Sequence, residues 1–593
     1  MNASQNHRIL TSALCLLGTS FWVGCSDVDL GDSGGGIEPP NEEGPAEWTM
    51  LGRDYASTYH QKLEDKISRD NVGDLKLHWS VEPAAQPNGT PVVVNGVVYA
   101  TSNGGSYAID ADSGEVLWEN RDLPATSSAA YHDGVLYIHT KIGLISAVNP
   151  ADGEVIWQTP SDTNRVTSGY SSPIVVDDFI LVGASSIEEG VVAEGATFRG
   201  GVIALDRETG EQRWRHYTAI PPYNGATVWS TVTVDLEARH VFGTTGNNYT
   251  GDGGPNSDSI FALDLDSGEL VWTTQLTEDD IFTILNPKSP DSDFGTNPTL
   301  FDADVDGVTR KMLAAGQKSG VVWGLDRGTG EVLWEKPVSG GSALIGGILN
   351  TGAYDGERLF FVSHNQQDRS DTTLVALDPA TGATVWQKTL EDWVWGPVTI
   401  ANGVLYVPTW TTLRGYNTET GDELFAFETP GTIASGTAIV DGRAYFGSGM
   451  AYIVGEREST IFALSLPGDD GPPTPPTATP APANTTFTSI YSDIFVSAGC
   501  AGGSCHGSGA GELSFASQAV AYDELVGVDA EGPECIENGG LRVDPGNPDN
   551  SLLMNKINGG DVVCGTNMPI TGMLEPDQID RIRTWIADGA AND

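Results

Sequence analysis

Basic residues are scarce in this sequence. Its 593 residues include 30 Lys and Arg against 80 Asp and Glu, which gives a formal net charge of −50 at pH 7. A surface that binds nucleic acid has to carry the opposite sign, because its contacts are made with phosphate groups. The composition therefore argues against a nucleic-acid partner and favours the strongly solvated surface of an exported protein.

Long apolar runs are also missing. Residues Ile9 to Val23 are apolar, but this run is too short for a comfortable membrane span, and it follows a positively charged start. Val23-Gly24-Cys25 resembles the end of a lipoprotein cleavage box. We therefore expect residues 1–25 to be an export signal, with Cys25 as the candidate site of a lipid anchor. Residues 26–46, rich in Gly, Pro and acid, are expected to form a disordered tether.

Helical periodicity is absent between Trp48 and Leu466, and a repeated phrase takes its place. The phrase is clearest at Ala204 to Trp214, which reads ALDRETGEQRW. Its other copies start at Ala108, Ala147, Ala262, Gly324, Ala376 and Gly415, and successive starts are between 39 and 62 residues apart. Self-similarity at such a period indicates a repeat architecture in which a short unit carries insertions of varying length.

Each copy predicts the same local structure. An apolar pair ends one strand, Asp-x-x-Thr-Gly or Asp-x-x-Ser-Gly makes a tight turn, and the Trp begins the next strand. Period-2 runs such as Thr90 to Ala100, with Asn95-Gly96 as a hairpin turn, lie between the copies. Four antiparallel strands per unit, repeated radially, form a β-propeller. A solenoid is the alternative, but helical periodicity is missing from these units.

The outer strands number eight. Counted by the aromatic residue that begins each one, the series is Trp79, Trp118, Trp157, Trp214, Trp272, Trp334, Trp386 and Phe425. The last inner strands, between Ala434 and Leu466, have no such strand after them. Leu75 to Val81 would complete that blade and close the ring, which pairs edges that would otherwise be exposed. We therefore predict an all-β, eight-bladed propeller over residues 47–467.

A second domain is expected after the propeller. Residues 468–486 form a Pro-rich linker, and residues 487–593 are enough for one compact domain. Its sharpest chemical signal is Cys500-Ala-Gly-Gly-Ser-Cys505-His506. Two thiols can bond the vinyl groups of haem while the adjoining His binds the iron, although the usual spacer is two residues rather than four. A disulfide between the two Cys residues, without haem, is the alternative.

The context of this motif supports haem. Thr488 to Val496 and Pro576 to Asp588 are expected to be helices. Met568, about sixty residues after the motif and followed by Pro, offers a thioether as the sixth iron ligand, which suits a low-spin electron carrier. Met554 and Met573 are rivals for that position, and Met568 could instead be an ordinary core residue.

The C-terminal segment resembles class I cytochrome c domains. The resemblance covers residues 487–590 and is carried by the motif above together with AYDELVGV, RVDPGNPDNSLL and a closing WIADGA. It implies a small all-α domain in which the two Cys residues of the motif attach haem c, while His506 and Met568 bind the iron. Cys535 and Cys564 remain, and in an exported protein a disulfide between them is expected.

Polar residues gather in the insertions of the propeller. Glu188, Asn247 and Asp293 come from consecutive blades, and oxygen ligands brought to one axial face would form a cage suited to Ca²⁺ or another hard cation. Trp229 offers a flat face for a planar cofactor, and Lys318 offers a charge for its oxygens. Taken singly, each residue has a plainer explanation as a solvated loop acid, a turn residue or a core Trp.

The same residues carry a resemblance to a known family. Through WTMLGRDYASTYHQ, SSIEE, TFRGGVIALD, GNNY and DFG, the region Trp48 to Leu466 resembles the quinoprotein alcohol dehydrogenases that use pyrroloquinoline quinone (PQQ), especially the polyvinyl-alcohol dehydrogenase branch. The resemblance implies that Glu188, Asn247 and Asp293 hold the metal and that Asp293 is also the catalytic base. The PQQ contacts that it implies are Trp229, Lys318, Arg165, Thr167 and Gly169.

The two resemblances together imply a quinohaemoprotein dehydrogenase. A hydroxyl-bearing substrate would be oxidised to an aldehyde or ketone by hydride transfer to PQQ, and electrons would pass through haem c to a periplasmic or membrane acceptor. The expected location is the periplasm or, through Cys25, the outer membrane of a Gram-negative bacterium. The rival is a non-catalytic propeller scaffold that carries an electron-transfer cytochrome. It would explain why the propeller has no cysteine, where many relatives carry an adjacent pair.

Overall fold

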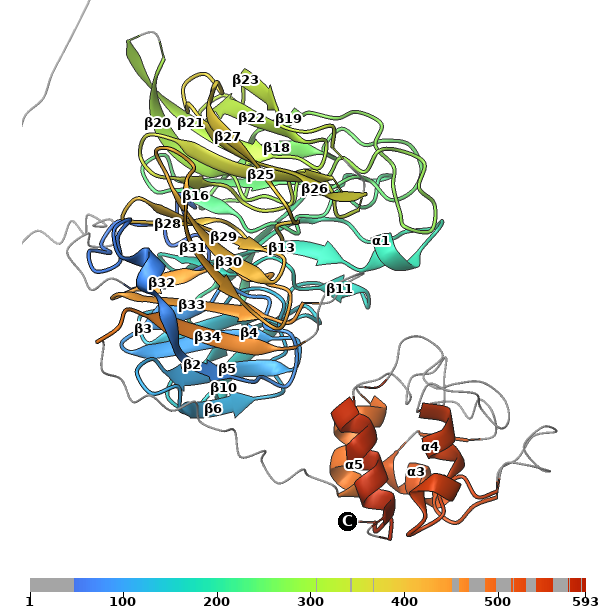
Figure 1. Cartoon of the computed structure of the whole chain (residues 1–593). Coiled ribbons are helices and arrows are strands. Elements are labelled where there is room, and N and C mark those ends of the chain that lie inside the picture. The colour runs from blue at the N-terminus through green and yellow to red at the C-terminus, as the bar shows by residue number, and fades with distance from the viewer. Residues whose placement is uncertain are drawn as a thin grey trace, which may run out of the picture. The chain divides into compact units, whose positions relative to one another are not determined.

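The structure is a computed structural model of the chain. It describes residues 47–305, 307–341, 344–365, 367–450 and 458–468, and then residues 486–496, 513–515, 517–529, 540–557, 574, 576–587 and 589–592. All of its named β-strands lie in the first group and belong to eight sheets (Figure 1). The second group contains helices.

Seven of the sheets are blades built from four consecutive strands, and β1 (His60–Gln61) and β11 (Thr167–Ser168) each add a short fifth strand to one of them. Blades 1 to 4 are β3–β6 (Val92–Val94, Val97–Ser102, Gly105–Asp110, Val116–Asn120), β7–β10 (Ala130–His132, Val135–His139, Leu144–Val148, Val155–Pro160), β12–β15 (Ile174–Val176, Phe179–Ser186, Gly201–Asp206, Gln212–Tyr217) and β16–β19 (Thr233–Asp235, His240–Thr244, Ser259–Asp264, Leu270–Gln275). Blades 5 to 7 are β20–β23 (Thr299–Val305, Val308–Gly316, Val321–Asp326, Val332–Pro337), β24–β27 (Ala353–Tyr354, Leu359–Asn365, Asp368–Leu377, Thr384–Leu390) and β28–β31 (Thr399–Ala401, Val404–Thr409, Thr412–Asn417, Glu423–Glu428).

The eighth blade joins the two ends of the propeller. It contains β32–β34 (Ala438–Val440, Arg443–Ser448, Thr460–Ser465), and its fourth strand is β2 (Lys76–Val81), which follows the short helix η1 (Val72–Asp74). β2 pairs antiparallel with β34, so that Trp79 lies opposite Ala463. The eight-bladed propeller predicted from the repeats is confirmed, and so is its closure by the strand around Trp79.

The repeated phrase is the contact between one blade and the next. Trp118 of blade 1 donates its indole N–H to the carbonyl of Pro150 in the turn of blade 2, at 2.8 Å. The ring also covers Gly153 of that turn, where a Cβ atom would come within 2.7 Å of it. Gly153 has φ of 74°, a left-handed conformation that favours glycine. The same indole bond to the neighbouring turn is made by Trp79, Trp214, Trp272, Trp334 and Trp386.

Phe425 departs from the Trp series for a structural reason. It lies in β31 of blade 7 and faces blade 8, whose fourth strand comes from the start of the propeller. β34 is therefore not joined to β2 by an Asp-x-x-Thr-Gly turn, and no such turn carbonyl is there to accept an indole N–H. Phe425 packs instead in an apolar cluster with Phe446 and Phe462 of blade 8.

Hydrogen bonds also join the blades near the axis. The backbone N–H at the start of one blade donates to a side-chain oxygen at the start of the next. The pairs are Ser128 to Ser172, Ser172 to Thr231, Thr231 to Asn297, Asn297 to Thr351 and Gly436 to Thr90, at 2.8–3.0 Å. These acceptor residues line a cavity of about 220 Å³. These hydrogen bonds therefore hold neighbouring blades together where no strand pairing links them.

The C-terminal group forms a separate small core. Its helices are α2 (Phe487–Ile490), η2 (Tyr491–Val496), α3 (Gln518–Leu525), η4 (Pro548–Asn550), α4 (Leu552–Ile557) and α5 (Pro576–Ala587). Phe487 stacks on Trp585 with ring centroids 5.0 Å apart, and Met554 is buried in the same apolar cluster. The two helices predicted here are present. Cys500, Cys505, His506, Met568, Met573, Cys535 and Cys564 lie outside the described residues, as does Cys25, so these assignments stay predictions.

Among the residues that the structure describes, no helix combines the length and the apolar character needed to cross a membrane.

Candidate functional site

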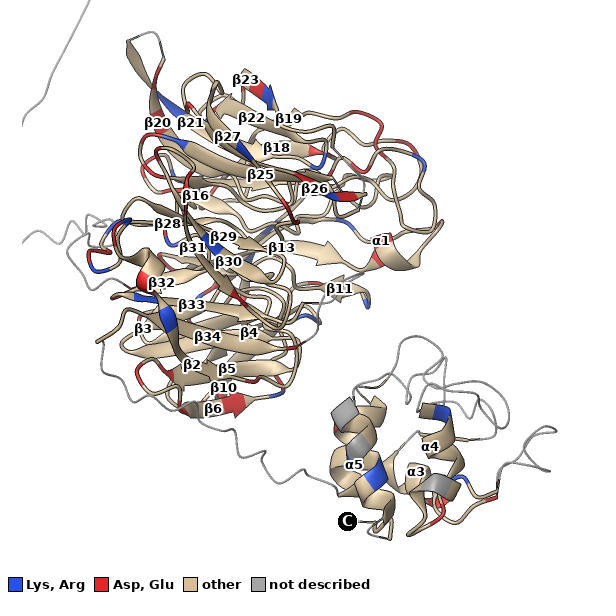
Figure 2. Ribbon diagram, viewed as in Figure 1, with Lys and Arg blue, Asp and Glu red and all other residues tan. Residues whose placement is uncertain are grey.

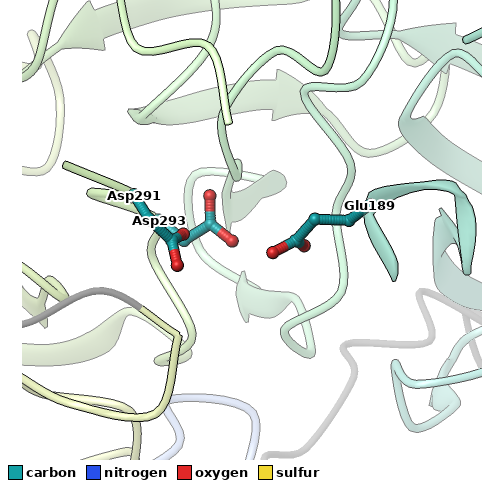
Figure 3. A group of neighbouring side chains, drawn as sticks. All are labelled: Glu189, Asp291 and Asp293. Carbon is teal, nitrogen blue, oxygen red and sulfur yellow. The ribbon is translucent and has the colours of Figure 1, made fainter. Parts of the chain in front are cut away.

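Three carboxylates meet on one face of the propeller. Glu189 lies in α1 (Glu188–Val191), the single helical turn between β13 and β14 of blade 3. Asp291 and Asp293 lie in the segment between β19 and β20, just before blade 5. One oxygen from each of the three residues lies within 4.8 Å of the other two. Glu189 and the two Asp residues reach toward one another from opposite sides (Figure 3).

Lys318 places one positive charge beside these acids. Its Nζ is 2.9 Å from Oδ1 of Asp291 and 3.2 Å from Oδ2 of Asp293, and its side chain is 5% exposed. Burial alone would lower the pKa of Lys318, but the neighbouring carboxylates outweigh burial and raise it well above the usual value. Lys318 is therefore a fixed cation.

Asp293 is held close to the backbone of blade 4. Its Oδ1 accepts the N–H of Asn247 at 2.6 Å. Gly246 permits this approach, since a Cβ at that position would lie 2.8 Å from the same oxygen. The Asn247 side chain donates from Nδ2 to the carbonyls of Asn248 and Phe282, and its buried Oδ1 has no partner among the described residues. The site thus contains an oriented amide oxygen that is available to a ligand.

The predicted glutamate ligand, Glu188, does not join the carboxylate group. Its buried carboxylate accepts hydrogen bonds from the N–H and Oγ1 of Thr197 and the N–H of Phe198, at 2.8–3.1 Å. Those contacts hold the loop that follows α1. Glu189 takes the position in the group instead. Burial raises the pKa of Glu189 to about 8, and the Lys318 ammonium offsets only part of this shift.

Trp229 lies beside the same group. Lys318 Nζ is 5.6 Å from the centroid of its ring. Gly295, two residues after Asp293, leaves room for the indole, because a Cβ there would be 2.4 Å from the ring. The ring also lines the axial cavity described above, and its buried Nε1 has no partner in the described chain. Trp229 and Lys318, each predicted as a contact of the cofactor, thus lie beside each other.

The remaining predicted contacts are less closely connected. Thr167, in β11 (Thr167–Ser168), pairs with Ser186 at the end of β13, which leads into α1. Gly169 has no space for a side chain, because a Cβ would lie 2.2 Å from the Thr140 carbonyl. Arg165 is exposed. For these three residues, no contact with the carboxylate group is recorded in the described ranges.

Two acidic residues beside the site, Asp258 and Asp280, were missed in the sequence, which offers Asp291 only as an alternative to Asp293 as the base. Asp291 belongs to the carboxylate group itself. Asp280 accepts the hydroxyl of Ser289 and the N–H of Ser292 (2.5 Å), which holds the segment carrying Asp293. Asp258 is fully buried, and burial raises its pKa well above the usual value. No motif distinguishes these residues from the other acids of a chain with 80 Asp and Glu.

The arrangement fits a hard cation beside a flat ligand. Carboxylate and amide oxygens are the donors that Ca²⁺ takes, and here Glu189, Asp293 and Asn247 provide them. Three carboxylates against one ammonium leave an excess of negative charge when all are ionised. The indole face of Trp229 and the Lys318 charge suit a planar ligand with anionic oxygens.

Comparison with known proteins gives two family matches within the propeller. Residues 159–346 match the family described as the β-propeller domain of glucose, ethanol and alcohol dehydrogenases. Residues 72–200 and 318–466 match the family described as outer membrane protein assembly factor BamB. The first of these matches spans Glu189, Asn247, Asp291, Asp293 and Lys318.

Curated relatives and solved structures agree with the first match. The chain is 31% identical over 361 residues to polyvinylalcohol dehydrogenase of Sphingopyxis sp. (strain 113P3), covering 53% of this chain and 55% of that protein. It is 28% identical over 378 residues to quinohemoprotein alcohol dehydrogenase ADH-IIG of Pseudomonas putida, covering 55% and 50%. The matches thus span about half the length of these relatives.

Two solved structures are similar in fold. The structure of ADHIIG from Pseudomonas putida HK5 matches with a TM-score of 0.62 at 19% identity, covering 92% of this chain and 95% of that one. A europium-containing methanol dehydrogenase matches with a TM-score of 0.61 at 19% identity, covering 72% and 99%. At such identities the likeness concerns the fold.

Proposed function

Because the propeller of this chain belongs to the family of PQQ-dependent alcohol and polyvinyl alcohol dehydrogenases, we propose that the chain oxidises a hydroxyl group to an aldehyde or ketone with PQQ as its cofactor. The observation that carries the proposal is the group formed by Glu189, Asp291, Asp293 and Lys318, in which both Asp residues and Lys318 are buried and Glu189 is half-buried. A propeller fold alone would not indicate an activity, since it serves many functions.

Each of these side chains has a role in the proposal. Glu189, Asn247 and Asp293 would hold Ca²⁺ or another hard cation, and Trp229 and Lys318 would hold the quinone. Bound PQQ would supply the acceptor for the hydride that leaves the alcohol carbon. The chain itself would orient the two reactants and keep water from them, since Asp293 and Lys318 are almost fully buried.

Asp293 is the proposed base for the hydroxyl proton. Its Oδ1 is engaged by the N–H of Asn247 at 2.6 Å, whereas the contact of its Oδ2 with Lys318 is longer, at 3.2 Å. Oδ2 is therefore the oxygen better placed to accept the proton. A general base must reach the proton that it removes, and geometry decides this before basicity does.

Exposed apolar side chains beside the site support a substrate with a carbon chain. Ile187 and Val191 flank Glu189 and are 44% and 54% exposed, and Ile284 and Leu285 on the adjoining loop are 39% and 57% exposed. The two loops touch, because the N–H of Ile284 donates to the carbonyl of Glu189 at 2.9 Å. Apolar surface next to a polar site commonly marks where a ligand binds.

The C-terminal domain and the location complete the proposal. Cys500 and Cys505 would attach haem c, and His506 and Met568 would bind its iron. Electrons would then leave singly to an acceptor outside the chain. The protein would act after export, in the periplasm or tethered through Cys25 to the outer membrane.

Reconstitution with PQQ and Ca²⁺, followed by a panel of primary and secondary alcohols, tests the proposal. Reduction of a dye acceptor should require alcohol, quinone and cation together. If no alcohol is oxidised and PQQ does not bind, the non-catalytic scaffold is favoured, in line with the second family match over residues 72–200 and 318–466.

The Asp293→Asn variant tests the proposed base. The change keeps the size and one oxygen for the cation, but the amide cannot accept the proton. Turnover should fall by about 10²-fold or more, while PQQ affinity should stay within about tenfold of the parent. An unchanged turnover would show that the base is another residue.

A further inference from the structure

We propose that Asp291 is a positioning residue, which shares the Lys318 ammonium with Asp293 and so leaves Asp293 Oδ2 the weaker bond and available to accept the hydroxyl proton. The inference rests on the proposed function, because it concerns the same reaction. It assigns a positioning role to an acid that the sequence offers only as an alternative base.

Both carboxylate oxygens of Asp291 are engaged by the protein. Oδ1 is 2.9 Å from Lys318 Nζ, and Oδ2 accepts the backbone N–H of Leu344 at 2.5 Å. The Asp291 side chain is fully buried. Such charge-assisted hydrogen bonds in a dry site fix both partners, since neither can exchange its bond for one to water.

The distances show which acid holds the ammonium. Lys318 Nζ is 2.9 Å from Asp291 but 3.2 Å from Asp293. If Asp293 were the only carboxylate within reach of Lys318, the ammonium would pair with it alone and form its shortest hydrogen bond there. With Asp291 present the ammonium is shared, and Asp293 Oδ2 keeps the weaker bond. The less engaged oxygen is the one that can reach the hydroxyl proton, and for a general base geometry decides before basicity does.

The hydrogen bond between Asp291 and Leu344 joins two residues with strained backbone conformations. Asp291 has φ of 63° and Leu344 has φ of 61°, so both partners of the second hydrogen bond adopt left-handed conformations. Asp tolerates this region, but Leu is rarely found there. Strained residues cluster where a site must hold a particular geometry. The cost is consistent with a positioning role for the bond between them.

Leu344 extends the contact into the wall of the site. The carbonyl of the next residue, Ile345, contacts Nε2 of the buried His364, and Asn350 donates from Nδ2 to the carbonyl of Val394. Leu344 and Ile345 also pack against an aromatic cluster that includes Trp393 and Trp410. Asp291 is therefore anchored to blades 6 and 7, which makes it a rigid support for Lys318.

A double-mutant cycle separates this role from a merely structural one. Asp291→Asn should lower kcat by about 10- to 100-fold, the usual scale for a small misplacement, with KM and PQQ affinity little changed. If Asp291 acts through Lys318, then Asp291→Asn should cost nothing more in a Lys318→Gln background. Asp291→Glu, which keeps the charge, should recover part of the loss. Asp279→Asn is the matched control, since Asp279 is exposed and also has a positive φ of 57°.

A crystal structure of Asp291→Asn gives a readout that does not depend on activity. Lys318 Nζ should lie closer to Asp293 Oδ2 than in the parent. An unmoved ammonium, or costs in kcat that add in the double variant, would overturn the inference. If Asp291→Asn does not fold, the crystal structure and the double-mutant cycle are carried out with Asp291→Glu instead. In that variant Lys318 Nζ should keep its parental position, whereas kcat should stay below the parental value. If the unsubstituted chain itself oxidises no alcohol, the result counts against the proposed function and not against this inference alone.

Discussion

Glu188 and Glu189 are neighbours in the chain, but their carboxylates make different contacts. Glu188 accepts hydrogen bonds from Thr197 and Phe198, whereas Glu189 faces Asp291 and Asp293. The run SSIEE predicts an acid at the end of a strand but not which one. The two-residue alternation of a strand ends there, so periodicity no longer says which side chain points inward.

The two glutamates are expected to respond differently to amidation. Glu189→Gln removes a charge from the carboxylate group and should weaken Ca²⁺ binding by about tenfold or more, because cation affinity depends on ligand charge. Glu188→Gln should leave the Ca²⁺ affinity nearly unchanged. It should lower the free energy of unfolding by about 1–3 kcal/mol, because it weakens the buried hydrogen bonds to Thr197 and Phe198. Calcium titration by calorimetry and urea unfolding measure the two effects. Equal losses of Ca²⁺ affinity would contradict this division.

His139 makes a second residue-scale prediction. It is fully buried, and burial lowers its pKa to about 4 from 6.5. Between these values the unfolded chain binds a proton that the folded chain does not, so stability falls as the pH drops from 6.5 toward 4. The full loss is about 3 kcal/mol. His139→Gln should remove this part of the pH dependence, which urea unfolding at several pH values would detect. If the free energy of unfolding of His139→Gln falls between pH 6.5 and 4 as steeply as that of the parent, His139 is not the group responsible.

At the scale of elements, the repeated phrase predicted the local structure of each blade. The turn, the covering Trp and the four-strand unit are local, so an eleven-residue pattern suffices to specify them. The departure at Phe425 became clear only with the closure, since the neighbouring blade receives its fourth strand from residues 76–81. The hydrogen bonds near the axis escaped prediction, because each joins residues from different blades, such as Ser172 and Thr231.

The indole bonds give a paired test at this scale. Trp118→Phe keeps the aromatic cover of Gly153 but loses the bond to the Pro150 carbonyl, and the free energy of unfolding should fall by about 1 kcal/mol. Phe425→Trp is the converse change, and it should not stabilise the propeller because blade 8 lacks the matching turn. Thermal unfolding of both variants decides the matter. A stabilised Phe425→Trp would mean that another acceptor exists beside blade 8.

At the scale of the whole molecule, closure and charge explain different properties. β2 and β34 close the ring, so all 34 strands found in the described residues are complete by Ser465. Acidic residues lie on turns around several blades (Figure 2), which suits a solvated surface. The sequence predicted the ring because it repeats. It could not predict how Asp291 and Leu344 approach, because that contact joins two insertions of no repeated pattern.

The last prediction concerns the division of labour between the propeller and the C-terminal domain. A chain that ends at Gly468 keeps every propeller strand found in the described residues and all the proposed PQQ-site residues, so it should fold and oxidise alcohol with an artificial dye at a rate within about threefold of the full chain. It should carry no haem. In the full chain, haem should remain with the polypeptide after acid-acetone extraction and become reduced when alcohol is added. Replacing Cys500 and Cys505 by Ser should abolish the retained haem without affecting dye reduction, because the thioether bonds hold the group while the chemistry lies in the propeller. Haem that passes wholly into the acetone would rule out covalent attachment. A folded but inactive truncated chain would show that the C-terminal domain takes part in the oxidation itself.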